Sequence, residues 1–374
     1  MQLDLCNLPT IYKAANQLLY GTISSPADDG DFEALHDIKI PRLDVVIFNA
    51  GIGGWTGLDW PRLAYNFVTK GWRQATTFPI FKMGTGGYLV NPVPSKATED
   101  PPTLGQVFCA NIFGHYIFAH ELIPLLSRQA SSNIPPGRLI WESSIEACWD
   151  HLSLSDFQAL GTTAAYESTK RLTDVLALTT DLPGVRPYSD AFFQNHKSDA
   201  QPIKPRTYVS HPGVVVTTIF PINFILFHLY KLAMYISRWI GSPLHPVTAY
   251  LGAVSMVWLT LASQEALDAQ HAERIKWGSA TDRLGRSYVK KTEVEGWGWE
   301  GKVEDEDALA NDEATGVLRK MVGRKSGAKY LTEERRQEFE AVGAECWKEM
   351  ERLRSEWEAR AGVGGGAARN GKAH

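Results

Sequence analysis

Tyr166 and Lys170 stand four residues apart and could together transfer a proton. The segment from Ala164 to Leu182 contains no Gly or Pro and has helical apolar spacing, which places the two side chains one turn apart on one face. A free tyrosine titrates near pH ~10, so a tyrosine that exchanges a proton near neutrality needs a positive neighbour to stabilise its phenolate. The spacing predicts either such a proton-transfer site or an ordinary surface pair.

Two polar clusters follow predicted strands. Leu43–Phe48 is a β-branched apolar run that ends at Asn49-Ala50-Gly51, and Arg138–Trp141 is followed in the same way by Glu142-Ser143-Ser144. Short apolar runs of this kind are typical of buried parallel strands. Ligands of open parallel sheets bind beyond the carboxyl ends of the strands. We therefore expect both clusters at the ligand-binding edge.

Asn111 interrupts a predicted helix between those strands. The chain from Leu104 to Leu126 has helical apolar spacing, and its expected core contacts are Val107, Ile112, Phe113, Ile117, Phe118, Leu122 and Leu125. Asparagine is mildly unfavourable inside a helix, so Asn111 is either a solvent-facing or locally bonded residue, or an amide that positions a water or a backbone carbonyl near the lysine. Periodicity leaves both interpretations open.

In this order, the Asn-Ala-Gly turn, the helical Asn, the Ser pair and Tyr-x-x-x-Lys resemble the short-chain dehydrogenase/reductase family. The resemblance runs from about Asp4 to about Val289 and implies a Rossmann-like, doubly wound parallel sheet. Several stretches are similar more specifically to the fungal sterol 3-ketoreductases of this family, namely residues 57–60, 110–116, 139–145, 152–157, 166–171 and 276–283.

The resemblance implies catalytic roles for four residues. Tyr166 would protonate the carbonyl oxygen as hydride arrives at carbon, and Lys170 would lower the tyrosine pKa and hold the nicotinamide ribose. Asn111 would anchor a proton-relay water. Ser144 would donate a hydrogen bond to the substrate carbonyl, which stabilises the developing alkoxide.

The serine role has two other candidates, Ser143 and Ser153. Ser143 is adjacent to Ser144, and Ser153 lies 13 residues before Tyr166, close to the spacing common in the family. We favour Ser144 because it directly follows the predicted strand, whereas Ser153 falls in an apparent insertion. Ser153 can instead cap the segment that starts near Leu154.

The same resemblance implies a site for NADP(H). Residues that would contact the cofactor are Asp4 at the adenine ring, Asn49, Ala50, Gly51, Tyr166, Lys170, Pro212, Gly213, Val214 and Thr217. The last four follow the predicted strand Thr207–Ser210, and Thr217 and the backbone near Val214 would contact the carboxamide. Without the upstream motifs, the Pro-Gly pair would be an ordinary turn. The preference for NADPH over NADH rests on the resemblance alone.

One part of the family pattern has no counterpart in the chain. Family members begin with a strand, a Gly-rich turn and a helix that receives the cofactor pyrophosphate. Met1–Leu5 resembles the third strand, so we expect the first two strands and the Gly-rich turn to be missing, as in an incomplete gene model, which would weaken cofactor binding. Residues 1–5 would then either pair with Leu43–Phe48 or leave an apolar edge exposed.

Composition fits one large α/β domain with an extension. The 374 residues are 44% hydrophobic, and a net charge of -4 argues against nucleic-acid binding, which needs a concentrated basic face. The four cysteines show no metal-ligand spacing, so we expect reduced thiols and no metal site.

Three segments outside the motifs concern the surface. Residues 53–103 are expected to fold against the substrate mouth, and the Pro-rich residues 183–206 to form a solvated loop. Residues 219–240 are strongly apolar but contain His228 and Lys231. We favour a lid that also attaches to the membrane surface over a buried core helix or a true membrane span.

The composition changes beyond Thr292, so we divide the chain into a reductase domain at 1–292, a charged helical extension at 293–361 and a disordered tail at 362–374. The extension contains the acidic run Glu304–Asp307 and a helix that Thr332 can cap. Its apolar stripe is formed by Phe339, Val342, Cys346, Met350, Leu353 and Trp357. This stripe packs either on the parent domain, which we favour, or on a partner or membrane.

The resemblance implies a reductase that uses NADPH to reduce the 3-keto group of a sterol in the C-4 demethylation steps of ergosterol biosynthesis. It also implies a position on the endoplasmic reticulum membrane or a lipid droplet, on the cytosolic face, beside other sterol-biosynthesis enzymes. Two alternatives stay open: the same chemistry on a steroid 17-ketone or another lipophilic carbonyl, or a catalytically impaired scaffold for sterol enzymes.

Overall fold

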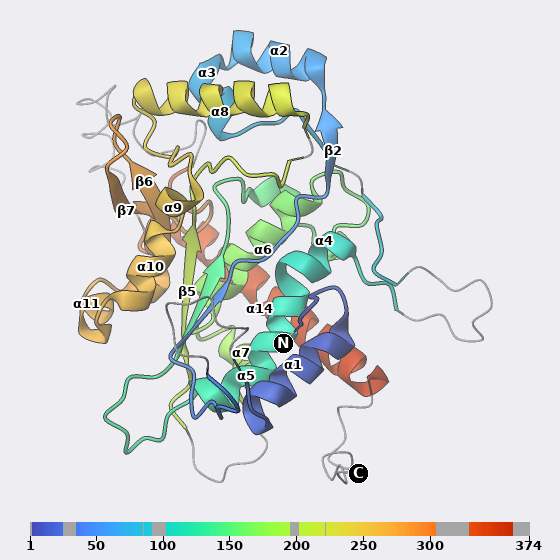
Figure 1. The fold of residues 1–374 in the computed structure, drawn as a ribbon, viewed down its shortest axis with the longest axis vertical. Helices are drawn as coiled ribbons and strands as arrows, with labels where there is room; N and C mark the ends of the chain where they lie inside the picture. Colours follow the sequence, from blue (N-terminus) through green and yellow to red (C-terminus); the bar gives the residue numbers. More distant parts are fainter. Residues whose placement is uncertain are drawn as a thin grey trace, which may run out of the picture.

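The computed structural model describes residues 2–24, 35–84, 86–91, 102–194, 202–220, 222–303 and 329–361. Within these ranges, the central sheet has the strand order β1 (Val45–Phe48), β4 (Arg138–Glu142), β5 (Arg206–His211), β6 (Lys276–Thr281) and β7 (Ser287–Thr292). β1, β4, β5 and β6 run parallel, and β7 is antiparallel to β6. Helices cover both faces (Figure 1). The predicted Rossmann-like α/β class is confirmed.

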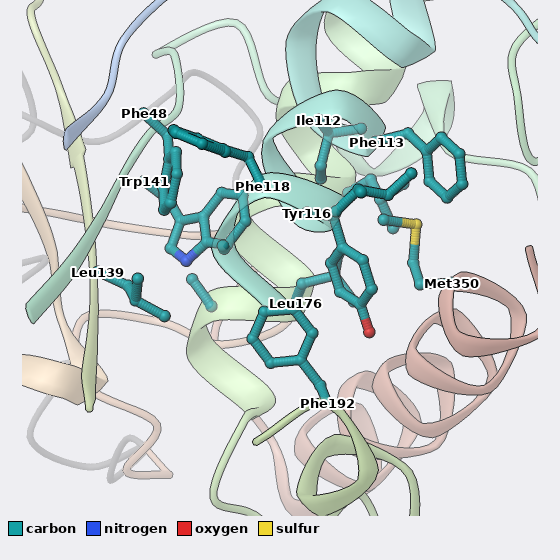
Figure 2. Packing of buried hydrophobic residues seen from close by; sticks show 14 of the residues in the cluster. Phe48, Ile112, Phe113, Tyr116, Phe118, Leu139, Trp141, Leu176, Phe192 and Met350 are labelled. Carbon is teal, nitrogen blue, oxygen red and sulfur yellow. The ribbon is translucent and has the colours of Figure 1, made fainter. Parts of the chain in front are cut away.

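The sheet separates two apolar cores because successive strand residues point to opposite faces. Leu139 and Trp141 join the larger core, whereas Ile140 and Tyr208 join the smaller one. The larger core contains residues of α1 (Leu8–Tyr20), α5 (Gly114–Leu126), α6 (Ala165–Thr179) and α7 (Arg186–Phe193), and Figure 2 shows its aromatic centre. The smaller core is covered by α10 (Val254–Leu261) and α11 (Gln264–Ala269).

The predicted helix from Leu104 to Leu126 is confirmed with one irregularity. It consists of α4 (Gln106–Phe108), the π-helical turn η1 (Cys109–Phe113) and α5. All seven apolar side chains expected in the core are buried. The π turn contains Asn111, and such turns are frequent at functional sites because they reposition backbone groups.

A lid layer of three helices stands beyond one end of the sheet (Figure 1). Two of them, α2 (Trp60–Thr69) and α3 (Gly71–Thr77), form the connection in the chain between β2 (Trp55–Leu58) and β3 (Lys82–Gly84), which pair as antiparallel strands. The third is α8 (Phe224–Trp239). Trp72 Nε1 donates to Ser237 Oγ at 2.9 Å, and Ser237 Oγ donates to Thr76 Oγ1 at 2.8 Å, which joins α3 to α8. α9 (Ala249–Gly252) follows α8 and precedes α10.

Among the helices within the described ranges, none has the length and apolarity needed to cross a bilayer.

The expectation of a solvated loop at residues 183–206 is wrong for residues 186–193. Residues 186–193 form α7, because Pro187 occupies the first turn, where the missing N–H of proline costs no helical hydrogen bond. Phe192 and Phe193 are buried, and Phe192 packs on the rings of Tyr116 and Trp347.

The long C-terminal helix α14 (Glu333–Arg360) packs on the parent domain, as we favoured. Its residues Phe339, Cys346, Met350 and Leu353 belong to the larger core, and Figure 2 shows Met350 near Tyr116. Tyr116 Oη donates to Glu351 Oε1 at 2.6 Å. The acidic run at 304–307 and the tail at 362–374 lie outside the described residues, and the domain boundaries stay a prediction.

The expected N-terminal strand is not formed, because residues 2–5 satisfy their polar groups in turns instead. Asp4 Oδ1 accepts the Cys6 N–H at 2.9 Å, and Thr10 Oγ1 donates to Asp4 O at 2.9 Å, which leads the chain into α1. Over the described residues, β1 pairs with β4 alone, and Ile47 is 40% exposed. Of our two alternatives, the exposed apolar edge is the one found.

Candidate active site

A cavity of about 1460 Å³ lies between the carboxyl edge of the sheet and the lid layer. Ligand pockets usually measure roughly 300–1,000 Å³, so this one exceeds the need of a single small ligand. Its sheet side is polar and is lined by Asn49, Ser144, Tyr166 and Lys170, among others. Its lid side is apolar and is lined by Trp55, Leu63, Phe67, Phe81, Phe220, Leu226, Leu229 and Met234, among others.

Tyr166 and Lys170 both line this cavity from the first turns of α6. The Lys170 Nζ lies 5.6 Å from the centroid of the Tyr166 ring and donates to the Glu142 backbone carbonyl at 2.7 Å. Burial lowers the pKa of Lys170 to about 8, opposed chiefly by the carboxylate of Glu142. The structure therefore places the ammonium beside the tyrosine, as the helical spacing predicted.

The buried surroundings of Tyr166 set the protonation state of its phenol, and the predicted effect of Lys170 on the tyrosine pKa stays a prediction. Burial raises the pKa of Tyr166, and the carboxylates of Glu146, Glu142 and Glu167 act in the same direction. A hydrogen bond with Ser144 opposes the shift. The phenol is therefore held in its protonated form, which is the form that a general acid needs.

The structure separates the three candidate serines. Ser144 lines the cavity with Tyr166, favours ionisation of the Tyr166 phenol and accepts the Glu146 N–H at 3.1 Å through its Oγ. Ser143 also borders the cavity, but its Oγ donates to the Lys170 backbone carbonyl at 3.1 Å. Ser153 is exposed, pairs with Ser155 at 2.9 Å and does not line the cavity. Of the three serines, Ser144 is therefore the one whose hydroxyl is available beside Tyr166 in the cavity.

Asn111 connects the loop after β1 to α6. Its Oδ1 accepts the Ile52 N–H at 2.7 Å, and its Nδ2 donates to Ile52 O at 2.9 Å and to Thr169 Oγ1 at 3.2 Å. A Cβ on Gly51 would lie 2.7 Å from Asn111 Oδ1, so this close approach requires glycine. The side chain does not line the cavity, and it acts locally to fix the Asn49-Ala50-Gly51 loop.

The turn after β5 borders the cavity with Pro212, Gly213, Val214 and Thr217. Gly213 has a φ of +70°, a conformation that favours glycine. The Val214 N–H donates to Leu244 O at 2.7 Å, so this amide is already bonded within the chain. Asp4 does not line the cavity, and its side chain is used in the turn before α1. The structure thus brings every predicted cofactor residue together except Asp4.

Sequence reasoning missed His211, which shapes that turn. Its Nδ1 accepts the Gly213 N–H at 3.0 Å, and this fixes the tautomer in which Nε2 donates to Thr292 Oγ1 at 2.7 Å. Burial lowers the pKa of His211 well below its usual range, so the ring stays neutral. Its position immediately before the Pro-Gly pair was the available signal.

Sequence reasoning also passed over Glu142, although it belongs to the polar cluster after β4. The residue lines the cavity, and its Oε2 has no hydrogen-bond partner among the described residues. Burial raises the pKa of Glu142 to about 7, and the ammonium of Lys170 opposes the shift. A buried carboxyl of this kind in a cleft is typical of functional sites.

A third missed residue, His115, supports the loop after β1. Its Nε2 bonds with Ala50 O at 2.8 Å, and its ring packs on Phe48. Burial lowers the pKa of His115 to about 4, so the neutral ring donates to that carbonyl.

The polar side of the cavity fits the nicotinamide end of a dinucleotide. The loop at 49–51, the turn at 212–217 and the ammonium of Lys170 all border the same space. For the pyrophosphate end, the described residues contain no Gly-rich turn that opens a helix at this edge. Fold and site together define a reductase of the short-chain dehydrogenase/reductase class, whose members take a nicotinamide cofactor.

Comparison with known proteins gives the family within this class. The 3-keto-steroid reductase of Gibberella zeae is 48% identical over 366 residues, covering 97% of this chain and 77% of that protein. That of Aspergillus fumigatus is 39% identical over 332 residues, covering 85% of this chain and 72% of that protein. That of Saccharomyces cerevisiae is 29% identical over 266 residues, covering 70% of this chain and 66% of that protein. The chain belongs to the family of fungal 3-keto-steroid reductases.

No protein-family model matches the chain. The crystal structure of an uncharacterized Mycobacterium paratuberculosis protein matches with a TM-score of 0.39 and 14% identity, over 95% of this chain and 75% of that one.

Proposed function

We propose that the protein reduces the 3-keto group of a sterol intermediate of ergosterol biosynthesis to a hydroxyl group, with NADPH as the reductant. The observation that carries the proposal is the placement of Tyr166 and Ser144 together at the polar side of a large cavity with an apolar roof. The names of the relatives support the choice of a 3-keto steroid.

Three residues of the chain have different roles in the reduction of the carbonyl group. The phenol of Tyr166 gives its proton to the carbonyl oxygen, and the Ser144 hydroxyl donates a hydrogen bond to the charge that develops there. The ammonium of Lys170 then stabilises the phenolate that remains. When bound, the nicotinamide supplies the hydride, and Lys170 and the turn at 212–217 would hold it. The lid excludes water from the reaction.

The apolar side of the cavity supports a lipophilic substrate. Aromatic and aliphatic side chains of α2, α3 and α8 cover the reacting groups, so a rigid apolar ring system can replace water along the lid. A free volume of about 1460 Å³ leaves room for a sterol and a nicotinamide together.

We further propose that the protein works on the cytosolic face of the endoplasmic reticulum membrane or of a lipid droplet, near other sterol-biosynthesis enzymes. Several apolar side chains of α8 face outward, with Phe224 78% exposed and Ile225 71% exposed. An apolar helix surface of this kind suits attachment to a lipid interface. Since sterols dissolve in membranes, such attachment brings the cavity to its substrate.

The test is product analysis with the purified full chain. We expect NADPH-dependent conversion of a 3-keto sterol to the 3-hydroxy sterol, faster than that of a 17-keto steroid and faster than with NADH. Tyr166→Phe should lower the rate by about 10²–10⁴-fold because it removes the acid. Ser153→Ala, which changes an exposed hydroxyl, is the matched control. Preference for the 17-ketone, or full activity in Tyr166→Phe, would contradict the proposal.

A further inference from the structure

Lys82 is a buried cation that the mechanism above does not use. It lies in β3, its side chain is 8% exposed, and it borders the cavity. Its Nζ forms ion pairs with the carboxylates of Glu146 and Glu167, the second at 3.1 Å. One ammonium therefore holds two carboxylates that are themselves largely buried.

These carboxylates belong to the segments that present the reacting groups. Glu167 follows Tyr166 in the first turn of α6. Glu146 lies in the loop after β4, and its N–H donates to the Ser144 Oγ at 3.1 Å. Lys82 thus connects the antiparallel pair of β2 and β3, here called the β2–β3 hairpin although α2 and α3 join its strands, with both the proposed acid and the proposed alkoxide-binding serine.

Aromatic contacts continue this connection across the hairpin. The Lys82 Nζ lies 3.9 Å from the centroid of the Trp55 ring on β2 and 5.4 Å from that of Tyr166. The Trp55 and Tyr166 rings are 4.7 Å apart. The backbone also approaches closely, since a Cβ on Gly84 would lie 2.1 Å from Thr163 O, just before α6.

We propose that Lys82 is a positioning residue that clamps the β2–β3 hairpin, and with it the lid helices α2 and α3, onto the start of α6. The clamp aligns Tyr166 and Ser144 with the roof of the substrate cavity. The inference rests on the proposed function, because the aligned groups are those of the ketone reduction. Breaking a buried ion pair leaves its partners uncompensated, so removal of the ammonium should release the hairpin from α6.

The test compares Lys82→Met with Lys82→Arg and with Lys291→Met. The last variant breaks a partly exposed lysine–glutamate pair with Glu300 and serves as the matched control. We expect Lys82→Met to raise the KM for the ketone about tenfold or more, because small misplacements of reacting groups are costly. Affinity for NADPH should stay unchanged, and Lys82→Arg should recover part of the loss.

A second readout does not require turnover. In Lys82→Met, amide hydrogen exchange should increase in residues 55–84 and in the first turn of α6. In Lys291→Met, exchange in these two segments should stay unchanged. If Lys82→Met does not fold, the charge-balanced double variant Lys82→Met/Glu146→Gln should show the same local increase.

Unchanged exchange and KM, or an increase spread evenly over the chain, would overturn the clamp. Absence of ketone reduction by the unmodified protein would instead overturn the proposed function, and the exchange measurement would still decide the clamp.

Discussion

Ser144 is the hydroxyl that we propose to contact a substrate oxygen, because it lines the cavity while the hydroxyl of its neighbour Ser143 donates to the backbone of α6. The two side chains follow the same strand and differ in direction, since alternate residues of extended chain point to opposite sides. A single position in the chain thus separates a proposed catalytic group from a structural one.

Replacement of each serine by alanine tests this assignment. We expect Ser144→Ala to lower kcat by about 10²–10³-fold, the usual loss when one donor to a developing oxyanion is removed. Ser143→Ala should mainly lower the free energy of unfolding, by about 1 kcal/mol, because it loses one buried hydrogen bond. Ser153→Ala should change neither quantity. Steady-state kinetics and urea unfolding separate these outcomes, and a larger kinetic loss in Ser143→Ala would reverse the assignment.

Glu142 makes a contribution to the free energy of unfolding that depends on pH. Burial raises its pKa to about 7 in the folded protein, above the usual value near ~4.3. The folded form therefore keeps the proton longer, and the stability that this gives at low pH is lost as pH rises from about 4 to 7.

We expect Glu142→Gln to become more stable relative to the unmodified protein between pH 5 and pH 8, by about 2–3 kcal/mol. The reason is that glutamine cannot ionise. Urea unfolding at the two pH values measures the difference, and Glu300→Gln, at a carboxylate far less buried, is the control. A relative stability that falls with pH would show that Glu142 is stabilised as an anion.

The helix α8 has one side on the cavity and another that is exposed. Leu226, Leu229 and Met234 line the cavity, whereas Phe224 and Ile225 point outward. One amphipathic element can therefore cover a substrate and contact a lipid surface.

We expect the double variant Phe224→Ser/Ile225→Ser to lose affinity for phospholipid vesicles, by about tenfold or more, because each large apolar side chain contributes about 1.5–3 kcal/mol on burial. Its activity on detergent-solubilised ketone should be unchanged. Vesicle co-sedimentation gives the affinity, and Ile134→Ser, in the loop before β4, is the control with an exposed apolar residue elsewhere. Equal sedimentation of all three proteins would rule out attachment through α8.

The molecule as a whole contains several buried neutral histidines. Burial lowers the pKa of His115 and of His245 to about 4, and it lowers that of His211 well below its usual range. Unfolding restores a pKa near ~6.5, so below that pH the unfolded chain binds protons that the folded chain does not. Stability is therefore lost as pH falls from about 6.5 toward 4.

We expect the free energy of unfolding to be lower at pH 5 than at pH 7, with a contribution of about 2 kcal/mol from each such histidine. Glu142 offsets part of this loss because its raised pKa acts in the opposite direction. Urea titrations at the two pH values measure the effect, and replacing His211 by glutamine should reduce it. A stability that does not change between pH 5 and pH 7 would contradict the prediction.

The order of the motifs in the sequence indicated the reductase class through their resemblance to a known family. Local patterns determined the helix that carries Tyr166 and Lys170 and the strand ends that carry Asn49 and Ser144. These features follow from side-chain periodicity and backbone preference within a few residues, so they can be found without a fold. The apolar stripe of α14 was found in the same way, and the tertiary structure decided that it packs on the parent domain.

Only the tertiary structure decided which groups around the reacting atoms are buried and paired. It placed Lys82 against Glu146, 64 positions away in the chain, and turned Asp4 away from the cavity. It also left the Glu142 Oε2 without a hydrogen-bond partner in the part of the chain that the structure describes. The physical reason is that desolvation and ion pairing depend on segments brought together from distant parts of the chain. Periodicity carries no information about those neighbours.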